Sequence, residues 1–159
     1  MLIIGAGGKS GLLCMYEAKK RAGVTGKVIA LAHSEASKAR AEATGFADVV
    51  IAGDATRPLE IMKMVEGATG GKMADVTINC VNIPGTEMSS ILSTRDMGII
   101  YFFSMATSFT AAALGAEGVG RDVTMIIGNG YTRGHAEIAL ETLRESPKLR
   151  KIFEDLYAR

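Results

Sequence analysis

Glycines crowd the segment from Gly5 to Gly11, directly after a short apolar stretch at the start of the chain. Glycine has no Cβ atom, so such a segment can turn tightly and bring its backbone close to a ligand. Where a turn of this kind leads from a strand into a helix, the free N–H groups at the helix start attract a diphosphate. We therefore predict that the diphosphate of a dinucleotide binds to Gly5, Gly7, Gly8, Lys9, Ser10 and Gly11.

The spacing of these glycines is a variant of a known pattern. Gly5, Gly7 and Gly11 follow G-x-G-x-x-x-G, because Ser10 stands where the shorter form G-x-G-x-x-G has its third glycine. Gly5 suits the tight turn, and Gly7 suits the close approach to the diphosphate. A turn that only begins a helix and binds nothing is the alternative interpretation.

The same segment contains Gly8-Lys9-Ser10, the ending of a P-loop. In that motif the lysine reaches the terminal phosphates and the serine holds magnesium, but a further glycine must lie five residues earlier, where this chain has Ile3. The strand that would supply a magnesium-organising acid at its end has Asp75 at its beginning instead. A P-loop phosphotransferase is therefore a disfavoured alternative.

The residues after the second apolar run indicate which dinucleotide binds. An acid about 20 residues beyond the glycines would accept hydrogen bonds from the adenosine ribose, but Ala32, His33 and Ser34 occupy this position. Because no carboxylate is present here, a 2′-phosphate would not be repelled, and the positive charges of Lys38 and Arg40 could attract it. We predict that Ala32, His33 and Ser34 contact the ribose and that NADP is favoured over NAD. Alternatively, Ser34 only caps a helix and His33 is an exposed loop residue.

Two further loops are expected at the nicotinamide end of a bound dinucleotide. Val81 and Asn82 follow the fourth apolar run, and Ser104 and Met105 follow the fifth. In a parallel sheet both loops would flank the same ligand, so we predict that these four residues bind the cofactor. Ordinary turn formation by Asn82 and Ser104 explains their presence equally well.

Side chains that would carry catalysis are not recognisable. Cys14 and Cys80 are far apart in the sequence and the chain has only two histidines, so no zinc site of the usual spacing can be written. We expect both cysteines to be buried packing residues. There is neither a Ser-Tyr-Lys arrangement nor a pair of carboxylates, and catalytic residues are left unassigned. The chain is typical of a cofactor-binding half whose catalytic half lies elsewhere.

Short apolar runs alternate with segments of helical period, which predicts strand-helix-strand units. The predicted strands are Leu2 to Ile4, Lys27 to Leu31, Val49 to Ala52, Val76 to Cys80, Ile99 to Ser104 and Val123 to Ile127. Most are apolar throughout, as expected for strands that helices cover on both faces. The fold class is therefore α/β: a doubly wound, six-stranded parallel sheet of the Rossmann type in three α/β/α layers, forming one dinucleotide-binding domain over residues 1–159.

The ends of several helices can also be predicted. Ser34 is expected to cap the second helix, with Gly45 after its last turn, and Thr56 to cap the third. Residues 107–121 fit either a weak helix or a loop, and residues 135–145 fit a helix.

Length and charge narrow the class of protein. The 159 residues fit one domain, and 18 basic against 17 acidic residues leave a net charge of +1, which gives no field to attract nucleic acid. The apolar runs are far shorter than the ~20 residues that cross a bilayer. We expect a cytoplasmic protein with a small-molecule substrate and neither nucleic-acid nor membrane partners. An apolar Val123–Ile127 strand at a sheet edge would favour a homo-oligomer.

Three segments carry a resemblance to a known family: residues 5–13, 28–34 and 79–87. They resemble the cofactor domain of the L-erythro-3,5-diaminohexanoate dehydrogenases, which are similar to medium-chain zinc-type alcohol dehydrogenases. The resemblance implies an NAD(P)-dependent amino-acid dehydrogenase of lysine fermentation, which oxidatively deaminates L-erythro-3,5-diaminohexanoate to 5-amino-3-oxohexanoate.

The catalytic domain that such enzymes carry upstream is absent, so we expect this chain alone to bind NAD(P) and to be inactive. A regulatory, nucleotide-sensing module without chemistry is the alternative.

Overall fold

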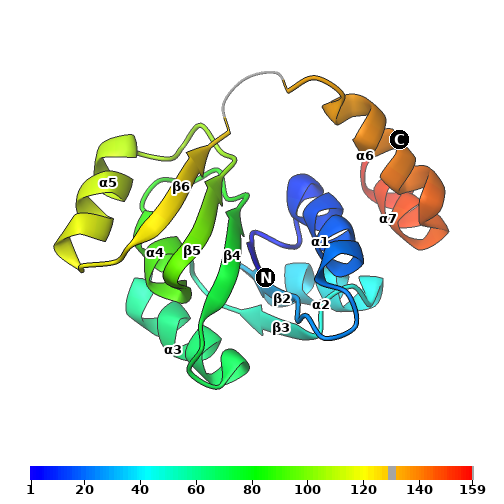
Figure 1. Cartoon of the computed structure of the whole chain (residues 1–159). Helices are drawn as coiled ribbons and strands as arrows, with labels where there is room; N and C mark the ends of the chain where they lie inside the picture. Colours follow the sequence, from blue (N-terminus) through cyan, green and yellow to red (C-terminus); the bar gives the residue numbers. More distant parts are fainter. Residues whose placement is uncertain (129–131, 159) are drawn as a thin grey trace.

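The computed structural model describes residues 1–128 and 132–158, which form a six-stranded parallel sheet with helices on both faces (Figure 1). The strands are β1 (Leu2–Ile4), β2 (Ile29–Ala32), β3 (Val49–Ala52), β4 (Ala74–Asn79), β5 (Thr94–Phe102) and β6 (Val123–Ile127). The helices are α1 (Lys9–Ala22), α2 (Glu35–Thr44), α3 (Pro58–Thr69), α4 (Glu87–Ser93), α5 (Phe109–Gly118), α6 (His135–Glu145) and α7 (Pro147–Tyr157). None of these described helices is long and apolar enough to cross a membrane.

The strand order is β3-β2-β1-β4-β5-β6, which confirms the doubly wound Rossmann-type sheet predicted from the alternation of runs. All neighbouring pairs are parallel. The direction of winding reverses between β1 and β4, and ligands of such sheets bind at that point, beyond the carboxyl ends of the strands.

The fifth strand differs most from its prediction. It begins at Thr94, five residues earlier than expected, and ends at Phe102, so that Ser104 lies beyond it. Polar residues hide this beginning in the sequence, but the Thr94 hydroxyl shares a buried hydrogen bond of 2.7 Å with the Thr77 hydroxyl of β4. The extension therefore depends on a contact between two strands.

Helix ends were predicted with mixed success. Ser34 caps α2 and forms a capping box with Ser37, and Gly45 ends the helix in the left-handed conformation, as expected. Thr56 was the wrong cap for α3: its hydroxyl donates to the Asp54 carboxylate at 2.7 Å, and Arg57 is the N-cap residue. Within the ambiguous segment 107–121, residues 109–118 form a helix.

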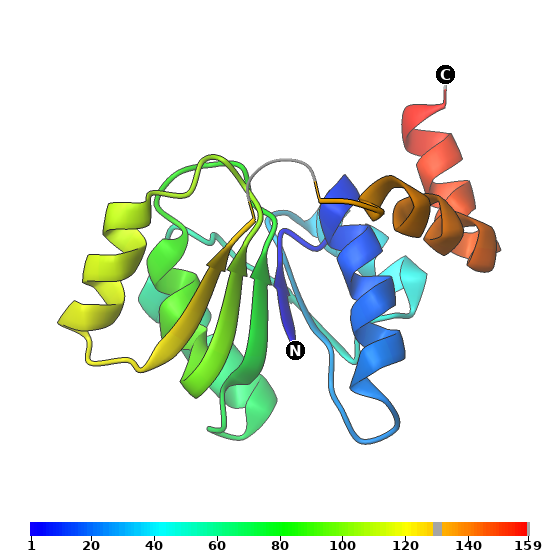
Figure 2. The same cartoon turned by 45° about the horizontal axis from the view of Figure 1, so that its top comes forward.

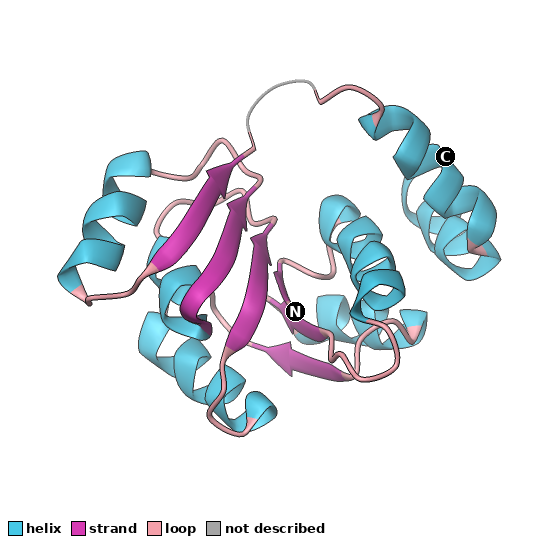
Figure 3. Ribbon diagram, in the orientation of Figure 1, coloured by secondary structure: helices cyan, strands magenta, loops and turns pink. Residues whose placement is uncertain are grey.

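Side chains that alternate along the strands form a hydrophobic core on each face of the sheet. Ile3 of β1 points to the layer of α1, α2 and α7, where Leu12, Met15 and Leu149 are fully buried. Leu2 and Ile4 point to the opposite layer, in which α3 covers one half of the sheet and α4 and α5 the other. Figures 2 and 3 show α3, α4 and α5 on one side of the strands and α1 on the other, with α6 and α7 beyond α1.

A buried leucine attaches the C-terminal helices to the rest of the domain. Leu149 of α7 is 0% exposed, whereas Leu140 of α6 is 53% exposed. We expect Leu149→Ala to lower the free energy of unfolding by about 3 kcal/mol, since it removes core contacts and leaves a cavity. The matched change Leu140→Ala should cost less than about 0.5 kcal/mol. Urea unfolding followed by circular dichroism measures both, and equal losses would show that α7 is not packed against the core.

Candidate functional site

A cavity of about 300 Å³ opens where the winding of the sheet reverses, beyond the carboxyl ends of β1 and β4. The loops that follow β1, β2, β3 and β4 form its wall. The lining residues are Ile4, Gly5, Gly7, Gly8, Leu31, Ala32, His33, Ser37, Gly53, Ala55, Cys80, Val81, Asn82 and Ile83. Seven of the predicted cofactor residues therefore lie around one cavity: Gly5, Gly7, Gly8, Ala32, His33, Val81 and Asn82.

Each of the three glycines of the pattern occupies a position that excludes a larger residue. Gly5 has a φ of +84°, which side chains rarely adopt. A Cβ atom on Gly7 would lie 2.6 Å from the Cβ of Ser37 in α2, and one on Gly11 would lie 2.2 Å from the carbonyl oxygen of Gly5. The turn is therefore compressed between α2 and the start of α1, and only glycine fits at these points.

Gly8 differs from the other three glycines. It is the N-cap residue of α1, with a φ of −87°, and no side chain caps this helix. A Cβ atom there would come no closer than 3.5 Å to the Gly5 carbonyl oxygen, an ordinary contact. The Gly8 N–H donates to that oxygen at 3.1 Å, while the N–H groups of the first helical turn have no intrahelical acceptor. The uncapped helix start next to the cavity suits an anion.

Two other contacts fix the shape of the turn. The N–H groups of Gly5 and Ala6 donate to the Leu31 carbonyl of β2 at 2.9 and 3.0 Å. The Arg40 guanidinium of α2 donates from Nη1 to the Gly7 carbonyl at 2.7 Å. Arg40 was expected to add positive charge near a 2′-phosphate, but in the structure its guanidinium binds the glycine turn instead. No local pattern in the sequence indicates this bond, since 33 residues separate its partners.

The end of β2 forms the wall at which a ribose was expected. Ala32 and His33 line the cavity, but the Ser34 hydroxyl accepts from the Ser37 N–H in the cap of α2 and is not in the wall. The lining residues include no acid. Asp54, which follows β3, is not among them. Its carboxylate accepts from the Thr56 N–H at 2.9 Å and from the Thr56 hydroxyl, and these hydrogen bonds hold the pKa of Asp54 below its usual value.

A buried asparagine positions the loop after β4. The Asn79 side chain is 2% exposed and donates from Nδ2 to the Thr86 hydroxyl at 3.0 Å and to the Ser90 hydroxyl at 2.9 Å. Its Oδ1 accepts from the Val81 N–H at 3.0 Å. These bonds hold both ends of the loop that carries Val81 and Asn82. An amide at the end of an otherwise apolar strand was the available signal, but Asn79 was not assigned a role from sequence.

The structure does not bring the other predicted cofactor residues to the cavity wall. Ser10 and Gly11 lie in the first turn of α1, and the Lys9 ammonium lies 4.1 Å from the centre of the Tyr157 ring in α7. Ser104 accepts from the Ala106 N–H at 3.1 Å, and Met105 is 86% exposed. Contact of these residues with a cofactor remains a prediction. The position of the Lys9 ammonium does not support the P-loop alternative.

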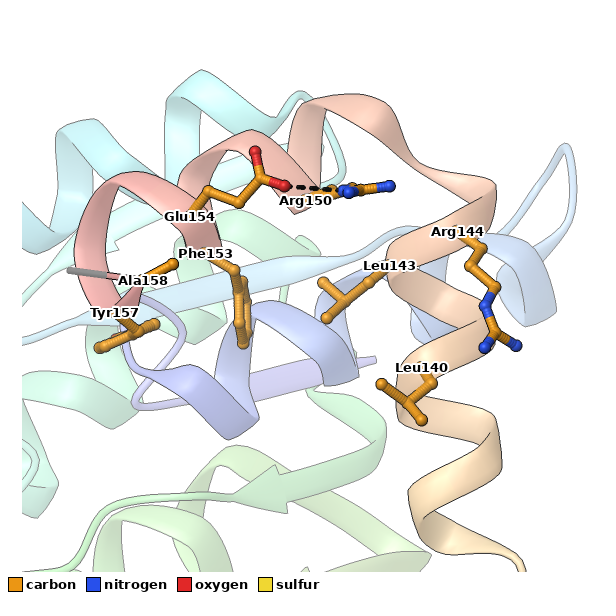
Figure 4. Close-up of a pocket in the computed structure, with 8 residues that line it drawn as sticks. All are labelled: Leu140, Leu143, Arg144, Arg150, Phe153, Glu154, Tyr157 and Ala158. Atoms are coloured by element: carbon orange, nitrogen blue, oxygen red, sulfur yellow. Dashed lines mark hydrogen bonds and ion pairs between the residues drawn. The ribbon is translucent and has the colours of Figure 1, made fainter.

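A second cavity, of about 370 Å³, lies between α6 and α7 (Figure 4). Apolar side chains, among them Leu143, Phe153 and Tyr157, form most of its wall, with an Arg150–Glu154 ion pair of 2.8 Å at the rim. Although it is larger and its wall includes Arg144 and Arg150, it lies between two helices, away from the point where the winding of the sheet reverses, and neither a glycine turn nor a helix start is part of its wall. The cavity at β1 and β4 is therefore the better candidate site. In residues 1–128 and 132–158, no group of three His, Cys, Asp or Glu side chains could hold a metal ion.

Comparison with known proteins supports the resemblance drawn from sequence, although no family model matches the chain. It is 58% identical over 157 residues to the L-erythro-3,5-diaminohexanoate dehydrogenase of Acetoanaerobium sticklandii, an alignment that covers 99% of this chain and 46% of that protein. It is 54% identical over 155 residues to the protein of the same name from Fusobacterium nucleatum, with coverages of 98% and 45%. The chain thus spans less than half the length of these curated relatives.

Solved structures share the fold at low sequence identity. Escherichia coli quinone oxidoreductase complexed with NADPH superposes with a TM-score of 0.63 at 20% identity, over 91% of this chain and 42% of its own. An alcohol dehydrogenase from Thermus superposes with a TM-score of 0.63 at 21% identity, over 89% and 38%. In sequence, then, this chain is similar to one part of the L-erythro-3,5-diaminohexanoate dehydrogenases, and it shares its fold with one part of alcohol dehydrogenases and quinone oxidoreductases.

Proposed function

We propose that this chain is the dinucleotide-binding part of an NAD(P)-dependent oxidoreductase. The observation that carries the proposal is the glycine turn between β1 and α1, which lies at the reversal point of the sheet and opens on a cavity without acidic lining residues. Gly7 and Gly8 line this cavity beside an uncapped helix start, a combination that suits the negative charge of a diphosphate.

Different residues around the cavity would contact the different parts of such a cofactor. The glycine turn would hold the diphosphate, Ala32 and His33 would contact the adenosine ribose, and Val81 and Asn82 would face the nicotinamide. When bound, a nicotinamide supplies hydride transfer. The part played by this chain is to position the cofactor: Arg40 and Asn79 hold the two loops that would contact it.

We further propose that a longer protein containing this domain oxidatively deaminates L-erythro-3,5-diaminohexanoate to 5-amino-3-oxohexanoate. The identities of 58% and 54% to dehydrogenases named for that substrate support this. The product keeps its 5-amino group and gains a 3-oxo group, so the carbon that loses hydride and ammonia is C3. The remaining part of the enzyme would supply the substrate pocket, because no catalytic constellation was recognised in this chain.

The dinucleotide proposal is tested most cleanly at Gly8. A Cβ atom added by Gly8→Val would lie at the cavity and make only an ordinary contact of 3.5 Å with the Gly5 carbonyl oxygen, whereas one on Gly7 or Gly11 would clash. We expect the variant to fold but to bind NADPH at least about tenfold more weakly, a loss of ~1.4 kcal/mol. The control Gly67→Val adds the same side chain to an open position on α3 and should leave binding unchanged. Fluorescence titration measures the affinities, circular dichroism checks folding, and unaltered affinity in folded Gly8→Val would refute the proposed site.

For the choice of cofactor, we propose that NADP is preferred, with His33 as the deciding residue. Because Ser34 and Arg40 are engaged elsewhere, we expect NADPH to bind only about three- to tenfold more tightly than NADH. His33→Asp should reverse this order, since a carboxylate repels the 2′-phosphate and accepts from a ribose hydroxyl. Thr25→Asp adds the same charge to an exposed loop at the opposite end of β2 and is the control. Tighter binding of NADH by the wild-type chain would contradict this preference.

We also propose that the chain forms a homo-oligomer through β6. This strand lies at the edge of the sheet, and its Ile126 and Ile127 side chains are 45% and 40% exposed. Such an apolar edge favours pairing with a second copy. Light scattering should therefore give a mass above the 16.7 kDa of one chain, and Ile126→Lys should lower it. A wild-type mass of one chain at all concentrations would count against the pairing.

A further inference from the structure

Two cysteines face each other beside the candidate cofactor cavity. Cys14 lies in α1, and Cys80 follows the last residue of β4. Their sulfur atoms are 3.9 Å apart, and the Cys80 thiol donates to the Cys14 sulfur. Both are free thiols and only partly buried, whereas burial was expected from sequence, although Cys14 does pack against the core. Cys80 also lines the cavity.

We propose that Cys14 and Cys80 form a reversible oxidation site, at which a peroxide converts the two thiols into a disulfide and a bound dinucleotide protects them. The oxidation itself depends only on the two thiols. The protection rests on the function proposed above, because it requires that a dinucleotide fill the cavity that Cys80 lines.

Formation of the bond requires the two sulfur atoms to move closer. A disulfide needs a sulfur–sulfur distance of about 2.05 Å, so the two atoms, now 3.9 Å apart, must approach by roughly 1.9 Å. The Cys80 N–H donates to the Ile4 carbonyl at 2.9 Å, and Cys14 sits within a regular helix. Both main-chain positions are therefore held by hydrogen bonds, and the approach has to come from rotation of the two side chains.

The hydrogen bond assigns the two sulfurs different roles. Donation from the Cys80 thiol lowers the pKa of Cys14, while the same bond and burial raise the pKa of Cys80. Cys14 therefore loses its proton more readily than Cys80, and its thiolate is the nucleophilic form. It attacks one oxygen of the peroxide, and the O–O bond breaks to leave a sulfenic acid on Cys14 and hydroxide. The Cys80 sulfur then displaces the sulfenic oxygen as water, forming the S–S bond and losing its proton. The two sulfurs lose two electrons, and the peroxide gains them.

Oxidation and cofactor binding are coupled because Cys80 lines the cavity in which the cofactor would bind. A disulfide would join α1 to the segment that continues from Cys80 into Val81 and Asn82, both of which line the cavity. If a dinucleotide binds the reduced chain more tightly, it must in turn stabilise the reduced thiols by the same factor. Cofactor affinity and the equilibrium between the two thiols and the disulfide therefore change together, and a dinucleotide that covers Cys80 would also slow its reaction.

Mass spectrometry of the peroxide-treated chain tests the oxidation. We expect loss of two hydrogen atoms, a non-reduced peptide that contains both Cys14 and Cys80, and recovery of both thiols with dithiothreitol. Cys80→Ser should gain oxygen on Cys14 instead of forming the internal bond, whereas Cys14→Ser lacks the nucleophile and should react more slowly than the wild-type chain. Gain of oxygen by the wild-type chain without the linked peptide, or no reaction, would overturn the proposal.

Repeating the oxidation with saturating NADP⁺ tests the coupling. We expect bound NADP⁺ to slow disulfide formation at least about fivefold, and the oxidised chain to bind NADP⁺ at least about fivefold more weakly. An unchanged rate with NADP⁺ bound would overturn the protection. If titration shows no NADP⁺ binding, the proposed function and the protection both fail, whereas the linked peptide still decides whether the disulfide forms.

Discussion

Close contact between the end of β1 and the start of α1 is the constraint on which the candidate site depends. Gly11 lies so near the Gly5 carbonyl that a Cβ atom would be 2.2 Å from its oxygen. This contact directs the uncapped helix start at the cavity beside the reversal point of the sheet. A larger residue at position 11 would push the helix away, and the N–H groups would no longer point at one small volume.

Two polar side chains, half-buried Arg40 and buried Asn79, then stabilise the loops around that volume. Arg40 bonds the Gly7 carbonyl from α2, and Asn79 bonds Val81, Thr86 and Ser90. Unmaking a buried hydrogen bond leaves a desolvated polar group, so these contacts favour one conformation of each loop. The cavity is therefore shaped before a ligand arrives, which reduces the ordering cost of binding.

Features of the fold that depend on local sequence pattern could be predicted from the sequence. Alternating apolar runs predicted the six strands, and the capping residue Ser34 was identified from its type alone. Tertiary contacts explain the misses: the early start of β5 needs the Thr77–Thr94 bond, and Arg40 reaches a residue 33 positions away. The contact of Lys9 with the Tyr157 ring was not predicted for the same reason, because no residue near Lys9 in the sequence indicates that α7 packs beside α1. Distant partners are not encoded in local spacing.

The central claim is that the N–H groups of the glycine turn hold the diphosphate of a dinucleotide. Amide chemical shifts of the isotope-labelled chain, recorded by NMR during addition of NADP⁺, test it most directly. We expect the largest changes at residues 5–11, with smaller ones at His33 and Val81. Changes confined to the cavity between α6 and α7, or none at all, would contradict it.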